Sequence, residues 1–160
     1  MATLQFWCLM YQNQHSLMQS LKIKLFQEKH FQWVKQRPGK PLWFGTSIDD
    51  VSVFALPGNP NSTLTCFVRY VASSISQLAG IGKILPGTAT MTGSRTFPPP
   101  LAHFLPVMAT HSESGALEVE PLPTQNSGDL SRLALSSGFI ELPADQKEFP
   151  VGFTAPFYPW

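Results

Sequence analysis

Charged residues are scarce in this sequence. Asp, Glu, Lys and Arg make up 13% of its 160 residues, whereas about 25% is typical of soluble domains. The 11 basic and 10 acidic residues nearly cancel, to a net charge of +1, and they form no basic cluster. Bulk nucleic-acid binding therefore has no electrostatic support. The low charge indicates instead that some of the surface meets another domain or another chain.

Cysteines and long apolar runs are also few. Only Cys8 and Cys66 are present, which argues against a disulfide framework and favours a reducing cytoplasmic location. The apolar stretch at residues 4–11 lacks a basic lead-in and a small-residue cleavage site, so we expect no signal peptide. No run approaches the roughly 20 apolar residues of a membrane span. We therefore expect a soluble protein without a membrane partner.

The first half of the chain carries helical and strand-like patterns in turn. Apolar spacing predicts a helix over residues 15–28, then strands over residues 31–35, 42–44 and 51–56. A second helix begins after Asn59, which caps it, has Pro60 in its first position, and ends near Gly80. This order suggests an α/β layer. Because a doubly wound sheet normally has about five strands or more, we expect a truncated domain.

From about residue 85 the elements become short, and glycine and proline separate them at close intervals. Strands are predicted over residues 104–110, 116–119, 138–142 and 153–157, with one helical turn over residues 130–135. Such spacing favours a small β-sheet or barrel. We therefore divide the chain into unassigned residues 1–14, an α/β part over residues 15–84 and a β-barrel over residues 85–160.

Two proline-glycine loops are the best candidates for a binding site. They are Arg37-Pro-Gly-Lys-Pro41 and Leu56-Pro-Gly-Asn-Pro60, and each follows a predicted strand. Ligands gather at the carboxyl ends of strands in open α/β sheets. The second loop leads into a helix N-terminus, which attracts anions, and Arg37 and Lys40 add two cations. The loops thus suit a phosphate or oxyanion, although such turns often only shape connections.

Other polar residues suggest structural roles. The histidines, which are His15, His30, His103 and His111, have no cysteine or carboxylate at metal-ligand spacing. We therefore predict structural histidines and assign no residue to a metal. Ser127, before Gly128 and Asp129, is typical of a turn that caps a helix.

The two loops and their neighbours resemble molybdopterin molybdenumtransferases, the MoeA and gephyrin E-domain family. The matching strings are Arg37-Pro-Gly-Lys-Pro-Leu-Trp-Phe-Gly45, Val53-Phe-Ala-Leu-Pro-Gly-Asn-Pro60 and the following Ser62. Residues 121–130 and 138–143 are similar to the family's C-terminal β-barrel domain, and the resemblance runs from about residue 17 to the last residue. It implies a truncated molybdopterin-binding-type three-layer α/β domain followed by a small C-terminal β-barrel domain.

The resemblance also implies an activity and a set of site residues. Family members bind adenylylated molybdopterin (molybdopterin-AMP) and molybdate, insert the metal into the dithiolene and release AMP, with magnesium (Mg²⁺) or zinc assisting. They form homodimers whose active site lies between the α/β domain of one chain and domains of its partner. Carried over residue by residue, the catalytic cations are Arg37 and Lys40. The substrate-binding residues are Gly39, Pro57, Gly58, Asn59, Ser62 and Ser127.

The chain departs from the family pattern at several points. Trp33 stands where a lysine is common, Pro106 where an arginine is usual, and Asn61 where valine is common. The family's glycine-rich Ser/Gly/Asp segment and its N-terminal domains are not found in these residues. We therefore expect little insertion activity from this chain alone. Two alternatives stay open: a non-catalytic molybdopterin-binding or dimerisation module, and an unrelated α/β protein with coincidental loops.

Overall fold

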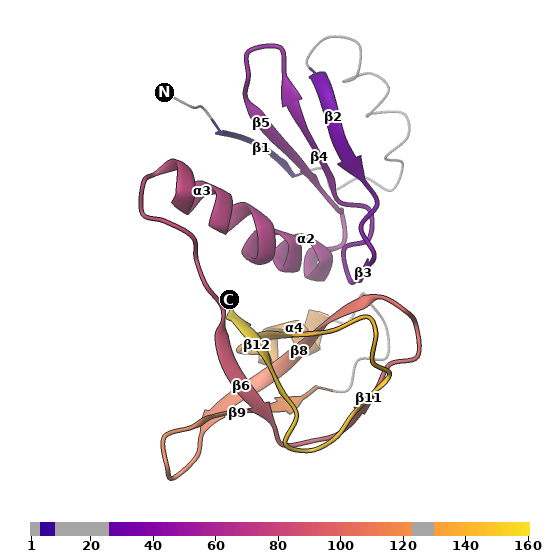
Figure 1. Ribbon diagram of the computed structural model, residues 1–160, viewed down its shortest axis with the longest axis vertical. Coiled ribbons are helices and arrows are strands. Elements are labelled where there is room, and N and C mark those ends of the chain that lie inside the picture. Colours follow the sequence, from indigo (N-terminus) through magenta and orange to yellow (C-terminus); the bar gives the residue numbers. More distant parts are fainter. Residues whose placement is uncertain (1–3, 9–25, 123–129) are drawn as a thin grey trace. The chain divides into compact units, whose positions relative to one another are not determined.

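The computed structural model describes residues 4–8, 26–122 and 130–160. The chain divides into two compact units, which are drawn in Figure 1. The first unit comprises residues 1–34 and 39–83, and the second comprises residues 35–38 and 84–160. Residues 35–38, which include Arg37 and Pro38 of the first loop, therefore belong to the second unit, and local sequence patterns did not predict this.

The first unit contains a four-stranded mixed sheet. Its strand order is β1 (Leu4–Cys8), β5 (Ser52–Leu56), β4 (Trp43–Ser47) and β2 (Phe26–Gln32). β1 runs parallel to β5, whereas β5 with β4 and β4 with β2 are antiparallel. A helical segment follows β5 and lies along the sheet in Figure 1; it consists of α2 (Pro60–Cys66), the π-helical turn η1 (Phe67–Val71) and α3 (Ala72–Leu78).

Both faces of β5 are buried, which explains its unbroken apolar sequence. Alternate residues of a strand point to opposite faces. Phe54 and Leu56 pack in one cluster with Cys66 and Val71 of the helical segment. Val53 and Ala55 pack with Trp43 in a separate cluster. The helical segment therefore covers the face that carries Phe54 and Leu56.

The helical segment begins and ends where the sequence predicts. Asn59 is the N-cap and Pro60 the first helical residue. Ala79 is the C-cap of α3, and Gly80 follows with a φ of +74°, a value that favours glycine. The cap residue and the stop are both confirmed.

One prediction for the first unit needs correction, and another is not shown by the described residues. The described residues form two layers, a sheet and one helical segment, so the third layer stays a prediction. The helix over residues 15–28 is wrong at its end, because Phe26 and Glu28 belong to β2 and pair with Ser47 and Thr46. Residues 15–25 lie outside the described part. Helical spacing is a local pattern and gives no information about a strand partner some 20 residues later.

The Asn59 cap gives a first testable prediction. Asn59→Ala removes the oxygen that accepts the Ser62 N–H, and we expect the free energy of unfolding to fall by about 1 kcal/mol. Asn59→Asp keeps an acceptor at this position and should stay close to the wild type. Urea denaturation of the three proteins measures the difference. Equal losses for both variants would show that the acceptor oxygen at residue 59 contributes nothing to the free energy of unfolding.

The second unit is a closed barrel of five strands. Around the barrel these are β8 (Ala102–His111), β9 (Leu117–Pro121), β6 (Gly87–Met91), β12 (Thr154–Pro159) and β10 (Gly138–Leu142), and β10 pairs again with β8. The short strand β3 (Gln36–Arg37) runs parallel to β8 outside the ring. β7 (Arg95–Thr96) pairs with β11 (Glu148–Phe149), and α4 spans Leu130–Leu135.

The barrel interior is filled by apolar side chains that are almost fully buried. They come from every strand of the ring and include Met91, Leu105, Val107, Val119, Ile140, Leu142 and Phe157. The predicted barrel is confirmed, and its predicted strands match β8, β9, β10 and β12 within a few residues. In the described part of the chain, no helix is long and apolar enough to cross a membrane.

Candidate functional site

Both proline-glycine loops of the first unit lie at the same end of its sheet. β4 and β5 are antiparallel, and Trp43 at the start of β4 pairs with Ala55 near the end of β5. The loop before β4 carries Gly39 and Lys40, and the loop after β5 carries Gly58. Residues that the sequence predicted as one site are therefore neighbours at one sheet end.

The backbone of the Gly39–Lys40 turn is fixed, and the Lys40 side chain is left exposed. Gly39 has a φ of +88°, which its lack of a Cβ permits. Its carbonyl oxygen accepts the Leu42 N–H at 3.2 Å and lies 3.8 Å from the Cys66 sulfur of α2. The Lys40 carbonyl accepts the Val34 N–H at 2.9 Å. Lys40 thus presents an exposed ammonium from an ordered turn.

The second loop acts first as a helix cap. Pro60 has no N–H, Asn59 Oδ1 accepts the Ser62 N–H at 3.1 Å, and the Asn59 carbonyl accepts the Thr63 N–H at 2.8 Å. The Ser62 hydroxyl is buried and donates to Asn59 Oδ1 at 3.3 Å. Within the described residues, only the Asn61 N–H of this first turn has no acceptor. Most donors that the sequence analysis offered to an anion are therefore used by the protein itself.

Four further positions are either predicted site residues or departures from the family pattern. Ser127 lies outside the described residues, so its predicted role stays a prediction. Trp33, which replaces a common lysine, is 54% exposed with a φ of +70°. Pro106 is buried on β8 opposite Phe139 of β10. Asn61 is buried, and its Oδ1 has no hydrogen-bond partner in the described part of the chain.

Arg37 belongs to the second unit and lies beside the barrel strand β8. In the parallel pairing of β3 with β8, Arg37 is opposite His103 and Gln36 is opposite Ala102. The Arg37 guanidinium carbon is 5.9 Å from the centre of the Phe97 ring, and the Phe97 and His103 rings stack at 4.0 Å and 24°. Arg37 remains exposed. One exposed cation therefore rests against a buried aromatic pair.

His103 is the most strongly perturbed titratable group in the described residues, and the sequence analysis predicted only a structural role for it. It is 4% exposed, and its Nδ1 has no hydrogen-bond partner within the described residues. Burial first, and then the charges of Arg95 and Arg37, lower the pKa of His103 from 6.5 to about 3. The imidazole is therefore neutral at physiological pH. Its position is readable from the strand pattern, because His103, Leu105 and Val107 alternate along β8.

The lowered pKa of His103 makes the barrel sensitive to acid. Between pH 6.5 and 3 the unfolded chain binds a proton that the folded chain does not, so stability present above pH 6.5 is lost as the pH falls. From pH 7 to pH 5 we expect a loss of about 2 kcal/mol that His103→Phe does not show. Urea denaturation at both pH values measures this difference. The same loss in both proteins would contradict the prediction.

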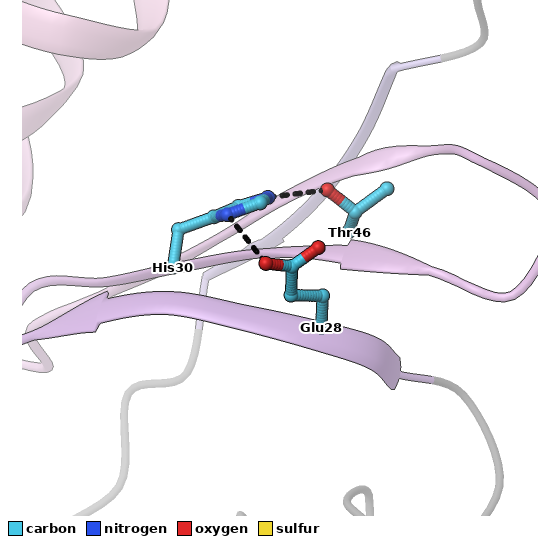
Figure 2. Close-up of polar contacts among 3 residues, drawn as sticks. All are labelled: Glu28, His30 and Thr46. Carbon is cyan, nitrogen blue, oxygen red and sulfur yellow. Dashed lines mark hydrogen bonds and ion pairs between the residues drawn. The ribbon is translucent and has the colours of Figure 1, made fainter.

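A polar group on the edge strand β2 is the remaining candidate, and Figure 2 shows it. His30 Nε2 lies 2.7 Å from Thr46 Oγ1, and His30 Nδ1 lies 3.7 Å from Glu28 Oε1. The ring also stacks on Phe44 at 5.1 Å. Both ionisable side chains are exposed, and such pairs contribute about 0–1 kcal/mol. We interpret this group as surface structure that orders the sheet edge.

The described residues do not build a metal site. No three side chains among their histidines, cysteines, aspartates and glutamates come together to hold an ion. The magnesium that the family resemblance implies therefore finds no set of ligands in this part of the chain. The first loop offers instead the cationic side chains of Arg37 and Lys40, which suit anions.

Comparison with known proteins assigns the barrel and relates most of the chain to one family. Residues 88–160 match the family model described as MoeA C-terminal region (domain IV). A molybdopterin molybdenumtransferase from Synechocystis sp. is 42% identical over 135 residues, which is 82% of this chain and 32% of the relative. A gephyrin from Dictyostelium discoideum is 35% identical over 68 residues, covering 33% of this chain and 10% of that protein.

The solved structures to which this chain is similar are also molybdopterin or molybdenum cofactor biosynthesis proteins. Two molybdopterin biosynthesis moeA protein structures from Pyrococcus horikoshii each give a TM-score of 0.65 over 82% of this chain and 32% of theirs, at 20% and 27% identity. A molybdenum cofactor biosynthesis protein from Pyrococcus furiosus gives 0.64 over 83% of this chain and 45% of that one. The chain spans about a third (32%) of the length of the molybdenumtransferase that it matches.

Proposed function

Since the chain is a relative of the molybdopterin molybdenumtransferases and corresponds to their C-terminal part, we propose that it acts in molybdenum cofactor biosynthesis. The proposed reaction is the insertion of molybdate into adenylylated molybdopterin with release of AMP, and we expect this chain alone to show little of that activity. The match of the barrel to the MoeA C-terminal region, together with 42% identity to a molybdenumtransferase, carries this proposal. Both substrates are anions, and this agrees with the cationic side chains of Arg37 and Lys40 on the first loop.

Arg37 and Lys40 are the residues to which we assign substrate contacts. Each is exposed, and in the described residues neither lies in an ion pair with a carboxylate. An arginine presents a planar fork of donors that fits two oxygens of a phosphate or of tetrahedral molybdate. A lysine contributes a compact point charge. We propose that Arg37 and Lys40 each bind an anionic group of the substrates.

The glycine and asparagine of the Leu56–Pro60 turn have a supporting part in this proposal. Their hydrogen bonds set the first turn of α2 and leave the Asn61 N–H as a backbone donor. We therefore assign Gly39, Pro57, Gly58, Asn59 and Ser62 to shaping the binding loops, and keep Ser127 as a proposed contact. Magnesium, a homodimer and a cytoplasmic location complete the proposal and rest on the family resemblance.

One experiment distinguishes a transferase from a non-catalytic binding module. The chain is titrated with adenylylated molybdopterin in a calorimeter, and AMP is then quantified after molybdate is added. Binding followed by AMP release supports the transferase. Binding without AMP release supports the alternative, a non-catalytic molybdopterin-binding or dimerisation module. No binding at all would contradict both.

A further inference from the structure

A buried aromatic pair of the second unit, Phe97 and His103, lies beneath the Arg37 guanidinium. His103 shares a face of β8 with Leu105 and Val107, which point into the barrel. Phe97 belongs to the same core and is 5% exposed. Its ring stacks on His103, with 4.0 Å between ring centres. The pair therefore belongs to the rigid interior of the barrel.

Strand pairing and neighbouring hydrogen bonds hold the Arg37 backbone beside this pair. Its backbone is fixed beside β8, because Arg37 pairs with His103 and the Ala102 N–H donates to the Lys35 carbonyl at 3.0 Å. The neighbouring Gln36 is 2% exposed and its amide donates to the Pro38 carbonyl at 3.0 Å. Side chains at paired positions of a parallel ladder project to the same side. The guanidinium, 5.9 Å from the Phe97 ring centre, then rests on the aromatic surface.

The chemistry of His103 fits an aromatic stacking surface better than a side chain that acts through its ring nitrogens. Its Nδ1 is buried and makes no hydrogen bond within the described residues, whereas a histidine used for its polarity is normally bonded through its ring nitrogens. A neutral ring also adds no positive charge next to Arg37 and Arg95, both of which face it. A cation on an aromatic face gains attraction and loses side-chain freedom.

We infer that Phe97 and His103 are positioning residues that hold the Arg37 guanidinium in place for an anion. The inference rests on the proposed function for its purpose, since an arginine fixed before binding has less freedom to lose when an oxyanion arrives. The contact between Arg37 and the pair is independent of any substrate. It is therefore open to a test without ligand.

The first arm of the test is nuclear magnetic resonance of the Arg37 Nε–H in the full, ligand-free chain. We expect its order parameter to fall in Phe97→Leu and in His103→Ala, and to stay near wild type in His103→Phe, which keeps the ring. Phe153→Leu, a change at another aromatic residue packed on the same core, is the matched control. Equal Arg37 order in wild type, Phe97→Leu and His103→Ala would overturn the inference. Should Phe97→Leu fail to fold, His103→Ala against His103→Phe decides in the same way.

The second arm is titration with sodium molybdate. Phe97→Leu should weaken binding by about threefold, the size of an exposed cation–π contact, and this loss should vanish when Arg37 is already alanine. A threefold loss that persists in the Arg37→Ala background would overturn the inference, because the effect would not pass through Arg37. If wild type binds no molybdate while Arg37 order still depends on Phe97, the proposed function fails and the positioning role stands.

Discussion

Replacing Gly138 with alanine is expected to open the barrel, with a loss of about 3 kcal/mol in the free energy of unfolding of the second unit. Gly138 begins β10 and pairs with both neighbours, Val107 of β8 and Pro159 of β12. A Cβ at this position would meet the Tyr158 carbonyl oxygen, and it would lie 2.8 Å from Pro159 Cα. These atoms belong to backbone, so they cannot turn aside as a side chain does.

We expect the loss of stability to be confined to β8, β10 and β12, where the barrel closes. Hydrogen exchange of the β8, β10 and β12 amides measures it, because these amides are protected only while the ring is closed. Gly87→Ala on β6 is the matched control, since a Cβ there finds no atom nearer than 3.8 Å. We expect Gly87→Ala to keep wild-type protection. Unchanged exchange in Gly138→Ala would show that β12 moves aside at little cost and that closure is not tight at this point.

Removing the two exposed cations should have the largest effect on binding. We expect Arg37→Ala and Lys40→Ala each to weaken binding of adenylylated molybdopterin by about tenfold, and the double variant by about a hundredfold. Each substitution deletes a charge-assisted contact that water only partly replaces. Calorimetric titration at fixed salt measures the three affinities, because screening by salt would otherwise blur the comparison.

Matched controls come from exposed lysines of the first unit. Lys29→Ala and Lys83→Ala each remove one positive charge from a position outside the two loops. We expect both controls to bind within about twofold of wild type, because distant exposed charges are screened. If the controls weaken binding as much as Arg37→Ala and Lys40→Ala do, general charge and not the loops holds the ligand.

The parts of the fold that the sequence predicted well are those with a local physical cause. The Asn59 cap, Pro60 at the first helical position and the stop at Gly80 depend on a few adjacent residues, and all three are observed. The barrel strand at Gly138–Leu142 was predicted with its observed bounds. Alternation and turn residues suffice for such elements.

The errors came from pairings between distant residues. Phe26–Glu28 continue a helical spacing, yet they form β2 because β4 supplies hydrogen bonds to them. Arg37 and Pro38 were predicted to form one loop with Gly39 and Lys40, but they belong to the second unit, where Arg37 pairs with β8. Long-range pairing overrides local preference in both cases. No pattern within a short window contains that information.

The sequence predicted the cationic residues of the candidate site but not the residues that hold them in place. Arg37 and Lys40 were found from their loops, and both are exposed. The donors expected at the start of α2 are mostly used by Asn59 itself, a consequence of the same capping chemistry that identified the helix. Phe97 and His103 were missed as neighbours of Arg37. The contact of Arg37 with this pair depends on the parallel pairing of β3 with β8, which the sequence alone did not indicate.

The most direct test of the proposed substrate contacts is a calorimetric titration of the unmodified chain with adenylylated molybdopterin, repeated with the Arg37→Ala and Lys40→Ala double variant. We expect saturable binding to the wild-type chain and binding about a hundredfold weaker to the double variant. An absence of binding to wild type, or equal affinity for both proteins, would contradict the assignment of this chain to substrate binding in molybdenum cofactor biosynthesis.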